Sequence, residues 1–546
     1  MPTPPIRTEI QNVAAESGSS GLPYGKALLP YLLLALVLGV FALIRIRLLN
    51  IPLERDEGEY AYIGQLLLQG VSPYKFAYSM KLPGTAAMYA AVFTLFGQSA
   101  GTIHAGLLLA NLVTILLVFF LAKEFFGAYG GVVGAATYAV LSASFSVLGF
   151  AGHATHFVVL FACAGILILL EALRSQRLFS YFFSGLLLGF AFLMKQPGVF
   201  FLLFAAVYLL RVQLRSRTRW PHLAMRISLL LLAGLLPFAI TCLLFWRSGT
   251  FPQFWFWTFT YAQQYGSIVP LQDAPILFYS AARSVVHPAI LVWVIAALGT
   301  TAFFWRHERR RDFFFALAFL FFSFLSLCPG YYFRSHYFIL LLPAISFLVA
   351  AAVVVGGQCL REHRLLRWLP ALAFIFAFSC AMVQQRQVLF AMSPVAASRF
   401  AYDLNPFAEA PAIAQFLQSH TSPGDTIAVL GAEPEIFFYS HRNSATGFIY
   451  SYPLLEDQPY ALTLQQKMIS QIEASRPPFI VLVPISWGRM HPRSPTLALD
   501  WAQNYLKENY IPAKSFSVPV DSLQWNPIPD EKHFTRPYAI QIFQRK

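Results

Sequence analysis

The sequence predicts a polytopic α-helical membrane protein that carries a C-terminal soluble α/β domain. Of the 546 residues, 57% are hydrophobic and 12% are charged, whereas about 25% of residues are charged in ordinary soluble domains. Long apolar segments recur as far as Val383, and beyond it they shorten to strand length while polar residues return. These observations exclude a soluble globular, disordered, collagen-like or coiled-coil chain.

The apolar segments predict about 11 transmembrane helices. A helix needs about 20 apolar residues to cross a hydrocarbon layer of about 30 Å. The first segment lacks a small-residue cleavage site and is interpreted as an uncleaved anchor, and the two short segments beside Lys195 could form one broken or re-entrant element. The expected spans are 27–44, 102–122, 129–148, 156–172, 181–193, 199–210, 227–245, 287–304, 313–327, 337–355 and 368–383.

Basic loops predict the orientation, because short cytoplasmic loops are enriched in Arg and Lys. With the N-terminal tail (1–26) in the cytoplasm, the basic loops 174–177, 211–226, 306–311 and 361–367 all lie on that side. Three arginines oppose this pattern and are interpreted as candidates for contacts with anionic lipid; they are Arg45, Arg47 and Arg55. The net charge of +14 therefore indicates membrane topology and not nucleic-acid binding.

Residues 394–546 are predicted to form a soluble domain outside the cytoplasm, after a transmembrane module at 27–393. Helical patterns alternate with buried strand patterns, which favours a small α/β sheet. The expected helices are 408–419, 462–475 and 497–509, and the expected strands are 426–431 and 479–485. This domain has no cysteine and no phosphate-binding glycine motif, so we expect the chemistry to lie elsewhere.

Cysteine and histidine spacing predicts neither a disulfide framework nor a metal centre. The five cysteines make no CxxC spacing, so no zinc site is indicated. His153 and His156 are three residues apart but have no carboxylate near them in the sequence. We interpret both as polar residues at a helix end.

The first outer loop, residues 49–101, has four acidic residues within six positions, which are Glu54, Asp56, Glu57 and Glu59. On a helix, Asp56 and Glu59 share one face and Tyr60 lies beside Asp56. Two interpretations are compatible. Asp56 and Glu59 could form a capping box, or a carboxylate at the membrane surface could act as a base or bind a divalent cation.

Cationic side chains are expected at the outer helix ends. They are Lys81, Lys195 and Arg334, and His336 is close to Arg334 in the sequence. Each could anchor its helix at the interface among aromatic residues, or neutralise a lipid phosphate. The outer loop 251–288 carries aromatic and amide side chains. We expect interfacial packing there, although such side chains also hold sugars.

Four motifs carry a family resemblance: Asp56-Glu57-Gly58-Glu59-Tyr60, Lys81-Leu82-Pro83-Gly84, Leu193-Met194-Lys195-Gln196-Pro197-Gly198 and Arg334-Ser335-His336-Tyr337-Phe338. Together with the topology, they resemble integral-membrane glycosyltransferases of the C superfamily. The nearest resemblance is to the bacterial family 39 type, which is related to protein O-mannosyltransferases and to enzymes that place aminoarabinose on lipid A. It implies a bacterial inner-membrane protein that transfers a sugar, with inversion, from a polyprenyl phosphate to a lipid, glycan or protein hydroxyl.

The resemblance also implies roles for single residues. Asp56 would be the general base and Glu57 would shape the site. The cations that would stabilise the leaving phosphate are Lys81, Lys195 and Arg334, with His336 beside them. Further candidates are Glu59, Tyr60 and Tyr337. Two departures are Glu59, where aminoarabinose transferases carry Arg, and Leu82, where the family commonly has Pro.

No cofactor is expected to be obligatory, although a divalent cation could bind. Three other functions stay open: a ligase or polymerase that uses a diphosphate-linked oligosaccharide, a lipid or solute transporter, and a non-catalytic scaffold. A transporter predicts charges near the membrane midplane and broken helices in two halves. Here the charges lie at the outer helix ends.

Overall fold

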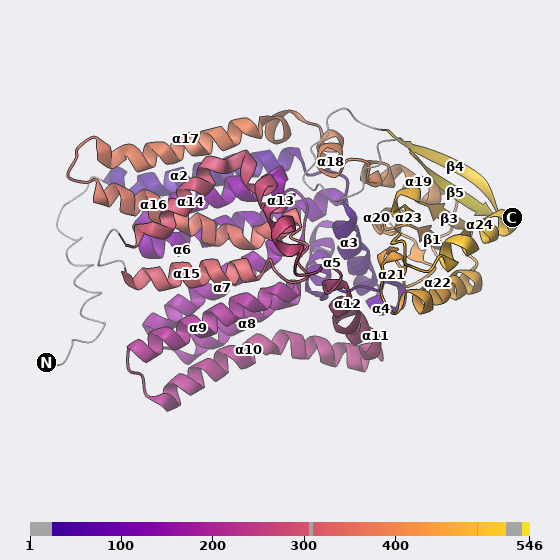
Figure 1. Ribbon diagram of the computed structural model, residues 1–546, viewed down its shortest axis with the longest axis horizontal. Helices are drawn as coiled ribbons and strands as arrows, with labels where there is room; N and C mark the ends of the chain where they lie inside the picture. Colours follow the sequence, from indigo (N-terminus) through magenta and orange to yellow (C-terminus); the bar gives the residue numbers. More distant parts are fainter. Residues whose placement is uncertain (1–23, 305–309, 489, 520–537) are drawn as a thin grey trace.

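The computed structural model describes residues 24–304, 310–488, 490–519 and 538–546. Long helices lie side by side in one part of the molecule, and a smaller part at the C-terminal end contains the β-sheet (Figure 1). Most of the predicted tail 1–26, and residues 306–309 of the third basic loop, lie outside the described residues.

Eight helical segments among the described residues are long and apolar enough to cross a membrane. A helix lies at each of the expected positions, some of them shorter than a full span, and the number that cross stays a prediction. The helices of this part are α2 (Tyr24–Arg47), α6 (Ala100–Ser142), α7 (Ala154–Ser175), α8 (Leu178–Met194), α9 (Val199–Arg215), α10 (Trp220–Arg247), α13 (Ala274–Val286), α14 (Ile290–Ala302), α15 (Arg310–Leu325), α16 (Leu342–Cys359) and α17 (Leu369–Gln384).

Two expected boundaries need refinement. The segments 102–122 and 129–148 are both part of α6, which breaks at Gly127, where φ is 75°; glycine adopts this left-handed conformation without a steric penalty. The short segments on either side of Lys195 are the separate helices α8 and α9, which pack against each other and are joined by a 3₁₀ turn.

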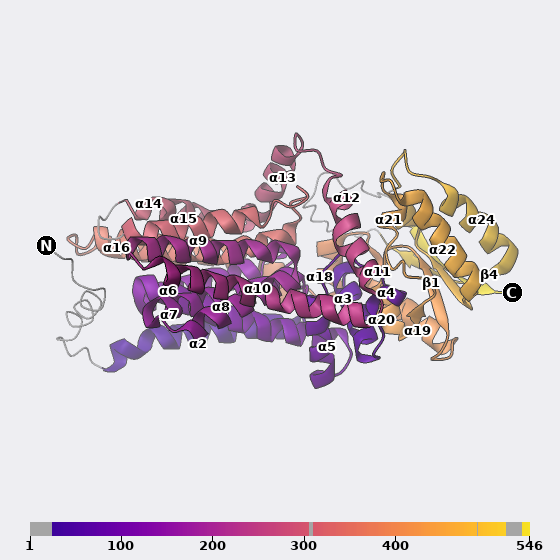
Figure 2. The same ribbon diagram turned by 90° about the horizontal axis from the view of Figure 1, so that it is seen from below.

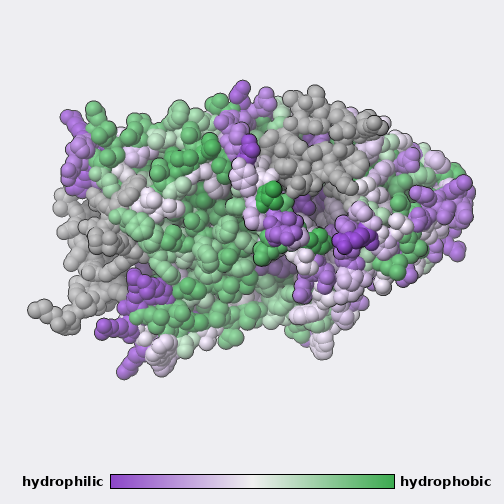
Figure 3. Space-filling view, in the orientation of Figure 1, coloured by the Kyte–Doolittle hydropathy of each residue, from purple (hydrophilic) through white to green (hydrophobic). Residues whose placement is uncertain are grey.

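The surface of the helical part matches a membrane protein. An apolar band covers the helices, and hydrophilic residues gather at the two ends of the molecule (Figure 3). The loops that join α9 to α10 and α16 to α17, which contain predicted basic segments, lie at the end away from the sheet (Figure 1). Which of the two ends is cytoplasmic stays a prediction.

Arg45 and Arg47 bind the protein itself, so their interpretation as lipid contacts is wrong. The buried Arg45 guanidinium donates to the carbonyls of Ser142 and Gly149, at 3.0 and 2.9 Å. Arg47 donates to three backbone carbonyls within residues 388–392. Carbonyl groups at helix ends have no partner inside the helix, and these arginines supply one.

The sheet has the order β2-β1-β3-β5-β4. Its strands are β1 (Thr426–Leu430), β2 (Asn443–Ser444), β3 (Phe479–Leu482), β4 (Tyr510–Val518) and β5 (Tyr538–Arg545). The first three pair in parallel, whereas β5 pairs antiparallel with β3 and β4. The predicted α/β domain is confirmed, with both predicted strands present as β1 and β3; β2, β4 and β5 were not predicted.

Helices cover this sheet and connect it to the membrane part. They are α18 (Pro394–Tyr402), α19 (Ala410–Ser419), α20 (Glu435–Ser440), α21 (Tyr452–Leu455), α22 (Ala461–Ser475), α23 (Pro484–Trp487) and α24 (Leu497–Asn509). The register places Val481 opposite Val429 on one side and Ile542 on the other, at the buried centre.

Two outer loops fold into short helices between the long helices and the sheet (Figures 1 and 2). The first outer loop forms α3 (Arg55–Leu68), α4 (Pro73–Phe76) and α5 (Gly84–Phe96). The second forms α11 (Phe251–Trp255), a π-helical turn (Phe256–Tyr261) and α12 (Ala262–Gly266). This layer positions the candidate site.

Candidate active site

A cavity of about 740 Å³ lies where the helix ends nearest the sheet meet the C-terminal part. Its walls come from both outer loops, the α8–α9 turn, the segment before α16 and the C-terminal part. Seven predicted site residues line it: Asp56, Glu59, Lys81, Lys195, Arg334, His336 and Tyr337. Glu57 and Tyr60 are outside its lining within the described part of the chain.

Helix α3 begins with a capping box, but the box is formed by Glu54 and Glu57, two residues before the predicted pair Asp56 and Glu59. Glu54 is the N-cap; its side chain accepts from the Glu57 N–H at 2.9 Å, and the Glu57 side chain accepts from the Glu54 N–H at 3.3 Å. The proposed Asp56–Glu59 box is therefore wrong. As a result, the cap leaves both of these carboxylates to face the cavity.

Lys81 joins these two carboxylates. Its Nζ lies 2.7 Å from Asp56 Oδ1, 2.5 Å from Glu59 Oε2 and 4.5 Å from the centre of the Tyr60 ring, so the predicted shared face of the helix is confirmed. Burial would raise the pKa of the Asp56 carboxyl, but Lys81 and the nearby imidazoles hold it well below its usual range. Asp56 is therefore ionised at neutral pH.

Glu59 is fully buried and links the first outer loop to the C-terminal part. In addition to Lys81, it accepts a hydrogen bond from the Tyr450 hydroxyl at 2.6 Å and one from the Ser79 hydroxyl. Charge-assisted hydrogen bonds of this kind fix a carboxylate firmly. Glu59 therefore positions Lys81 at the cavity wall.

Glu57 points away from the cavity. Its Oε1 accepts from the Gly152 N–H at 2.5 Å and lies 3.0 Å from Nε2 of the buried His104. Glu57 thus supports the turn that precedes α7, and any role in shaping the site acts through that turn.

The remaining cations also reach the cavity. Lys195 caps the C-terminal end of α8, and its Nζ lies 3.8 Å from the centre of the Tyr337 ring. Burial lowers the pKa of Lys195 to about 7, with Lys81 acting in the same direction and Asp56 opposing it. The Arg334 guanidinium lies over the Tyr332 ring at 5.5 Å. These side chains therefore face a shared space instead of lying among lipids.

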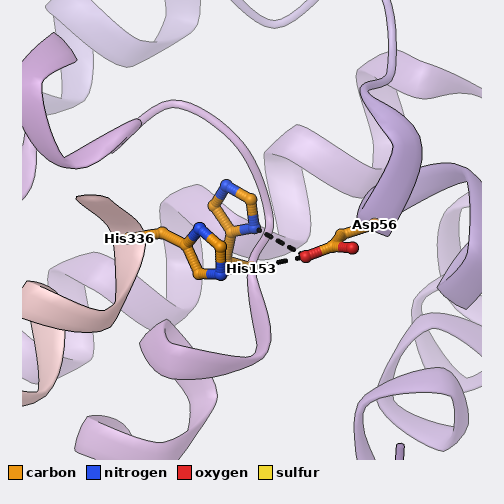
Figure 4. A group of neighbouring side chains, drawn as sticks. All are labelled: Asp56, His153 and His336. Atoms are coloured by element: carbon orange, nitrogen blue, oxygen red, sulfur yellow. Dashed lines mark ion pairs between the residues drawn. The ribbon is translucent and has the colours of Figure 1, made fainter. Parts of the chain in front are cut away.

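Two histidines from distant parts of the sequence face Asp56 (Figure 4). The His153 and His336 rings stack with centroids 4.0 Å apart. His153 Nδ1 lies 3.6 Å from Asp56 Oδ2, and His336 Nε2 lies 3.8 Å from the same oxygen. His153 lies at the N-cap position of α7, as expected of a helix-end residue, and the fold supplies the carboxylate neighbour that its sequence surroundings lack.

Arg55 holds the C-terminal part against α3, so its interpretation as a lipid contact is wrong. Its Nε donates to the Ala432 carbonyl at 2.7 Å and its Nη2 to Asn405 Oδ1 at 3.0 Å. Nη2 also lies 3.7 Å from Glu433 Oε1. The cavity is thus closed on one side by contacts between protein parts.

Aromatic residues form much of the remaining wall. Tyr78 stacks on Trp257 at 4.9 Å, and Tyr265 stacks on Tyr332 at 4.7 Å. The second outer loop, expected to pack at the interface, therefore contributes directly to the cavity.

Tyr450, Tyr452 and Glu456 are among the lining residues that the sequence interpretation missed. Glu456 accepts a hydrogen bond from the Tyr261 hydroxyl at 2.7 Å, and burial raises the pKa of its carboxyl to about 7. The one available signal was the close spacing of the two tyrosines and the acid in the sequence.

Comparison with protein families identifies one similar group. A family model described as dolichyl-phosphate-mannose-protein mannosyltransferase matches residues 80–239. The matched segment contains Lys81 and Lys195. No curated protein matches the chain in sequence.

Solved structures of similar fold cover nearly the whole chain. ArnT from Cupriavidus metallidurans bound to undecaprenyl phosphate has 15% sequence identity and a TM-score of 0.58, with 96% of this chain and 98% of that chain covered. The same protein in the apo state has 16% identity and a TM-score of 0.52, with 94% and 97% covered.

A third structure is the oligosaccharyltransferase AglB from Archaeoglobus fulgidus in complex with an inhibitory peptide and a dolichol-phosphate. It has 12% identity and a TM-score of 0.53, with 90% of this chain and 73% of that chain covered. The chain shares the fold of ArnT and AglB, and the predicted resemblance to mannosyltransferases and to ArnT is confirmed.

Proposed function

We propose that the protein transfers a sugar from a polyprenyl-phosphate-linked monosaccharide to an acceptor hydroxyl at the outer face of a membrane. The observation that carries the proposal is the cavity in which ionised Asp56 shares one space with Lys81, Lys195 and Arg334. Structures of the same fold contain undecaprenyl phosphate or dolichol-phosphate, which supports a lipid-phosphate donor here.

The proposed reaction uses the two kinds of charge in turn. The acceptor oxygen attacks the anomeric carbon while the bond from that carbon to the phosphate oxygen breaks. The bonding electrons leave with the polyprenyl phosphate, and the hydroxyl proton passes to Asp56 Oδ2. Attack opposite the leaving group inverts the anomeric configuration. A positioned base of this kind contributes about 10²–10⁴-fold to a rate.

Cations stabilise the leaving phosphate, where negative charge accumulates. Arg334 keeps its charge at all physiological pH values. Lys195, whose pKa burial lowers to about 7, becomes protonated more completely when an anionic phosphate approaches it. The phosphate also attracts Lys81 away from Asp56, which makes the carboxylate a stronger base as the donor binds.

The test is transfer by purified protein from a panel of radiolabelled polyprenyl-phosphate monosaccharides, with membrane extract as the acceptor source. Asp56→Asn should lower transfer at least ~100-fold while size-exclusion behaviour is retained. The matched control is Asp500→Asn, because Asp500 is an exposed acid on α24.

Transfer retained in Asp56→Asn would exclude Asp56 as the base. If no monosaccharide donor supports transfer but a diphosphate-linked oligosaccharide does, the ligase or polymerase alternative would replace this proposal.

A further inference from the structure

Two hydroxyl groups and one cation contact the carboxylate of Glu59. Its Oε2 accepts a hydrogen bond from the Tyr450 hydroxyl at 2.6 Å and lies 2.5 Å from Lys81 Nζ. Its Oε1 accepts a hydrogen bond from the Ser79 hydroxyl. Glu59 is fully buried, so bulk water does not compete with these groups for its oxygens.

Tyr450 belongs to the C-terminal part, 391 residues from Glu59 in the sequence. A tyrosine hydroxyl has one hydrogen to donate. The other acceptor beside it is the Arg55 carbonyl, at the longer distance of 3.2 Å, so the hydrogen is directed to Glu59. Burial and the charge of Glu59 raise the pKa of the Tyr450 hydroxyl well above its usual range, and the group is therefore a donor at neutral pH.

Tyr450 and Lys81 compete for the same oxygen of Glu59. A short hydrogen bond to an ionised oxygen is strong, and it withdraws negative charge that would otherwise attract the lysine. Lys81 Nζ also lies 2.7 Å from Asp56 Oδ1, so its position depends on the balance between two carboxylates. Charges interact strongly in such buried surroundings, and the Tyr450 hydroxyl therefore leaves Lys81 more available to another anion.

We propose that Tyr450 is a positioning residue, which limits the attraction of Glu59 for Lys81 and thereby raises the affinity of the cavity for a lipid phosphate. The inference rests on the proposed function, in which the donor phosphate draws Lys81 away from Asp56. Without the Tyr450 hydroxyl, Lys81 would shift toward Glu59 and away from the phosphate. The C-terminal part thus contributes to donor binding through the first outer loop.

A direct contact between Tyr450 and the donor is the competing explanation, because Tyr450 also lines the cavity. The variant Glu59→Gln distinguishes the two, since it removes the negative charge through which Tyr450 acts on Lys81. An effect that passes through Glu59 disappears in this background, whereas the effect of a direct contact persists.

The test is binding of a polyprenyl phosphate without its sugar to the full-length protein in detergent, measured by isothermal calorimetry. Tyr450→Phe should raise the Kd about fivefold, and the same change in a Glu59→Gln background should alter it by less than about twofold. The matched control is Tyr510→Phe. Tyr510 is also a buried tyrosine of the C-terminal part, and its hydroxyl donates to the Pro477 carbonyl at 2.8 Å, but it is outside the cavity lining in the described chain.

Thermal melting of each variant separates unfolding from weaker binding. If Tyr450→Phe does not fold, Ser79→Ala removes the other hydroxyl that donates to Glu59 and should raise the Kd in the same direction. Unchanged affinity in the folded variant, an equal loss in Tyr510→Phe, or an effect of Tyr450→Phe that persists with Glu59→Gln would overturn the proposal. If the wild-type protein does not bind the polyprenyl phosphate, the proposed donor is wrong as well, so the two failures are distinguishable.

Discussion

Asp56 has two different environments at its two oxygens. Oδ1 bonds to Lys81, whereas Oδ2 faces the histidine pair and the cavity. A carboxylate paired with a lysine is ionised but is a weak base. In the proposed reaction, arrival of the donor phosphate competes for Lys81, so donor binding and activation of the base are coupled.

The pH dependence of kcat/KM tests Lys195, whose pKa burial lowers to about 7. A lysine is cationic below its pKa, so phosphate binding should be strongest below pH 7 and kcat/KM should fall as pH rises above it, because this parameter reports the free enzyme.

Lys195→Arg should move this fall to higher pH, since arginine stays charged. Glu456 titrates in the same range, and a fall that persists unchanged in Lys195→Arg would assign the pH dependence to another group.

Removing Lys81 tests the buried charge cluster. Lys81→Met would leave Asp56 and the fully buried Glu59 without their cation, and breaking a buried pair in this way costs about 3–5 kcal/mol. We expect a lower melting temperature in detergent, with part of the loss recovered in the double variant Lys81→Met and Glu59→Gln. Equal melting of Lys81→Met and the wild type would show that the pair adds nothing to stability.

At the scale of elements, α3 and α20 approach unusually closely at Gly58. A Cβ atom at this position would lie 2.5 Å from the Glu435 backbone nitrogen and 2.7 Å from its Cα. Because neither is the flexible end of a side chain, the helices would have to separate.

Gly58→Ala should therefore destabilise the protein by about 1–3 kcal/mol and lower transfer, measured by thermal melting and the labelled-donor assay. The control is Gly39→Ala on α2, where no described atom lies within 4 Å of the added Cβ. A melting temperature for Gly58→Ala that matches the control would contradict this tight packing.

Hydrophobic patterning predicts most elements but not all of them. The expected helix 497–509 coincides with α24, and 462–475 differs from α22 by a single residue. Strand β4 was missed because most of its residues are exposed and Pro512 lies at an irregularity in its register. Such an edge strand lacks the apolar pattern on which strand prediction depends.

The capping error at α3 has a different cause. Glu54 and Asp56 can both cap a helix, and each has an acid three residues later. In the helix start at Glu54, the Glu57 side chain also contacts Gly152 and His104. Both partners are remote in the sequence. Local spacing therefore could not distinguish the two starts.

Sequence motifs predicted one side of the site better than the other. The four matching motifs contain most of the charged residues that line the cavity. They could be predicted to lie together because each motif lies at a helix end and these ends were expected at one surface. Tyr450, Tyr452 and Glu456 belong to no motif, and the meeting of His153 with His336 depends on how the helices pack. Side chains that meet only through tertiary packing give no periodic signal.

For the whole molecule, both parts of the chain build the cavity, because its lining includes the segment 401–405 and side chains around Tyr450 as well as the outer loops. The C-terminal part is therefore structurally integral to the site, although its sequence contains no motif that predicted this.

The predicted orientation places the basic loops in the cytoplasm and the C-terminal part on the opposite side. Alkaline phosphatase fused after residue 546 should be active, and green fluorescent protein inserted in the loop 361–367 should fluoresce. Phosphatase activity of a fusion in the 361–367 loop would reverse the orientation. The positive-inside rule supplies the reason for the expected result.

Strand β5 follows every other strand in the sequence, yet it lies between β3 and β4. While a ribosome is still adding residues after β4, one edge of β3 has no strand to pair with. Exposed edges are templates for pairing with other chains. The growing polypeptide is therefore most prone to aggregate in the interval between translation of β3 and translation of β5, and a chaperone that acts on this protein should act there.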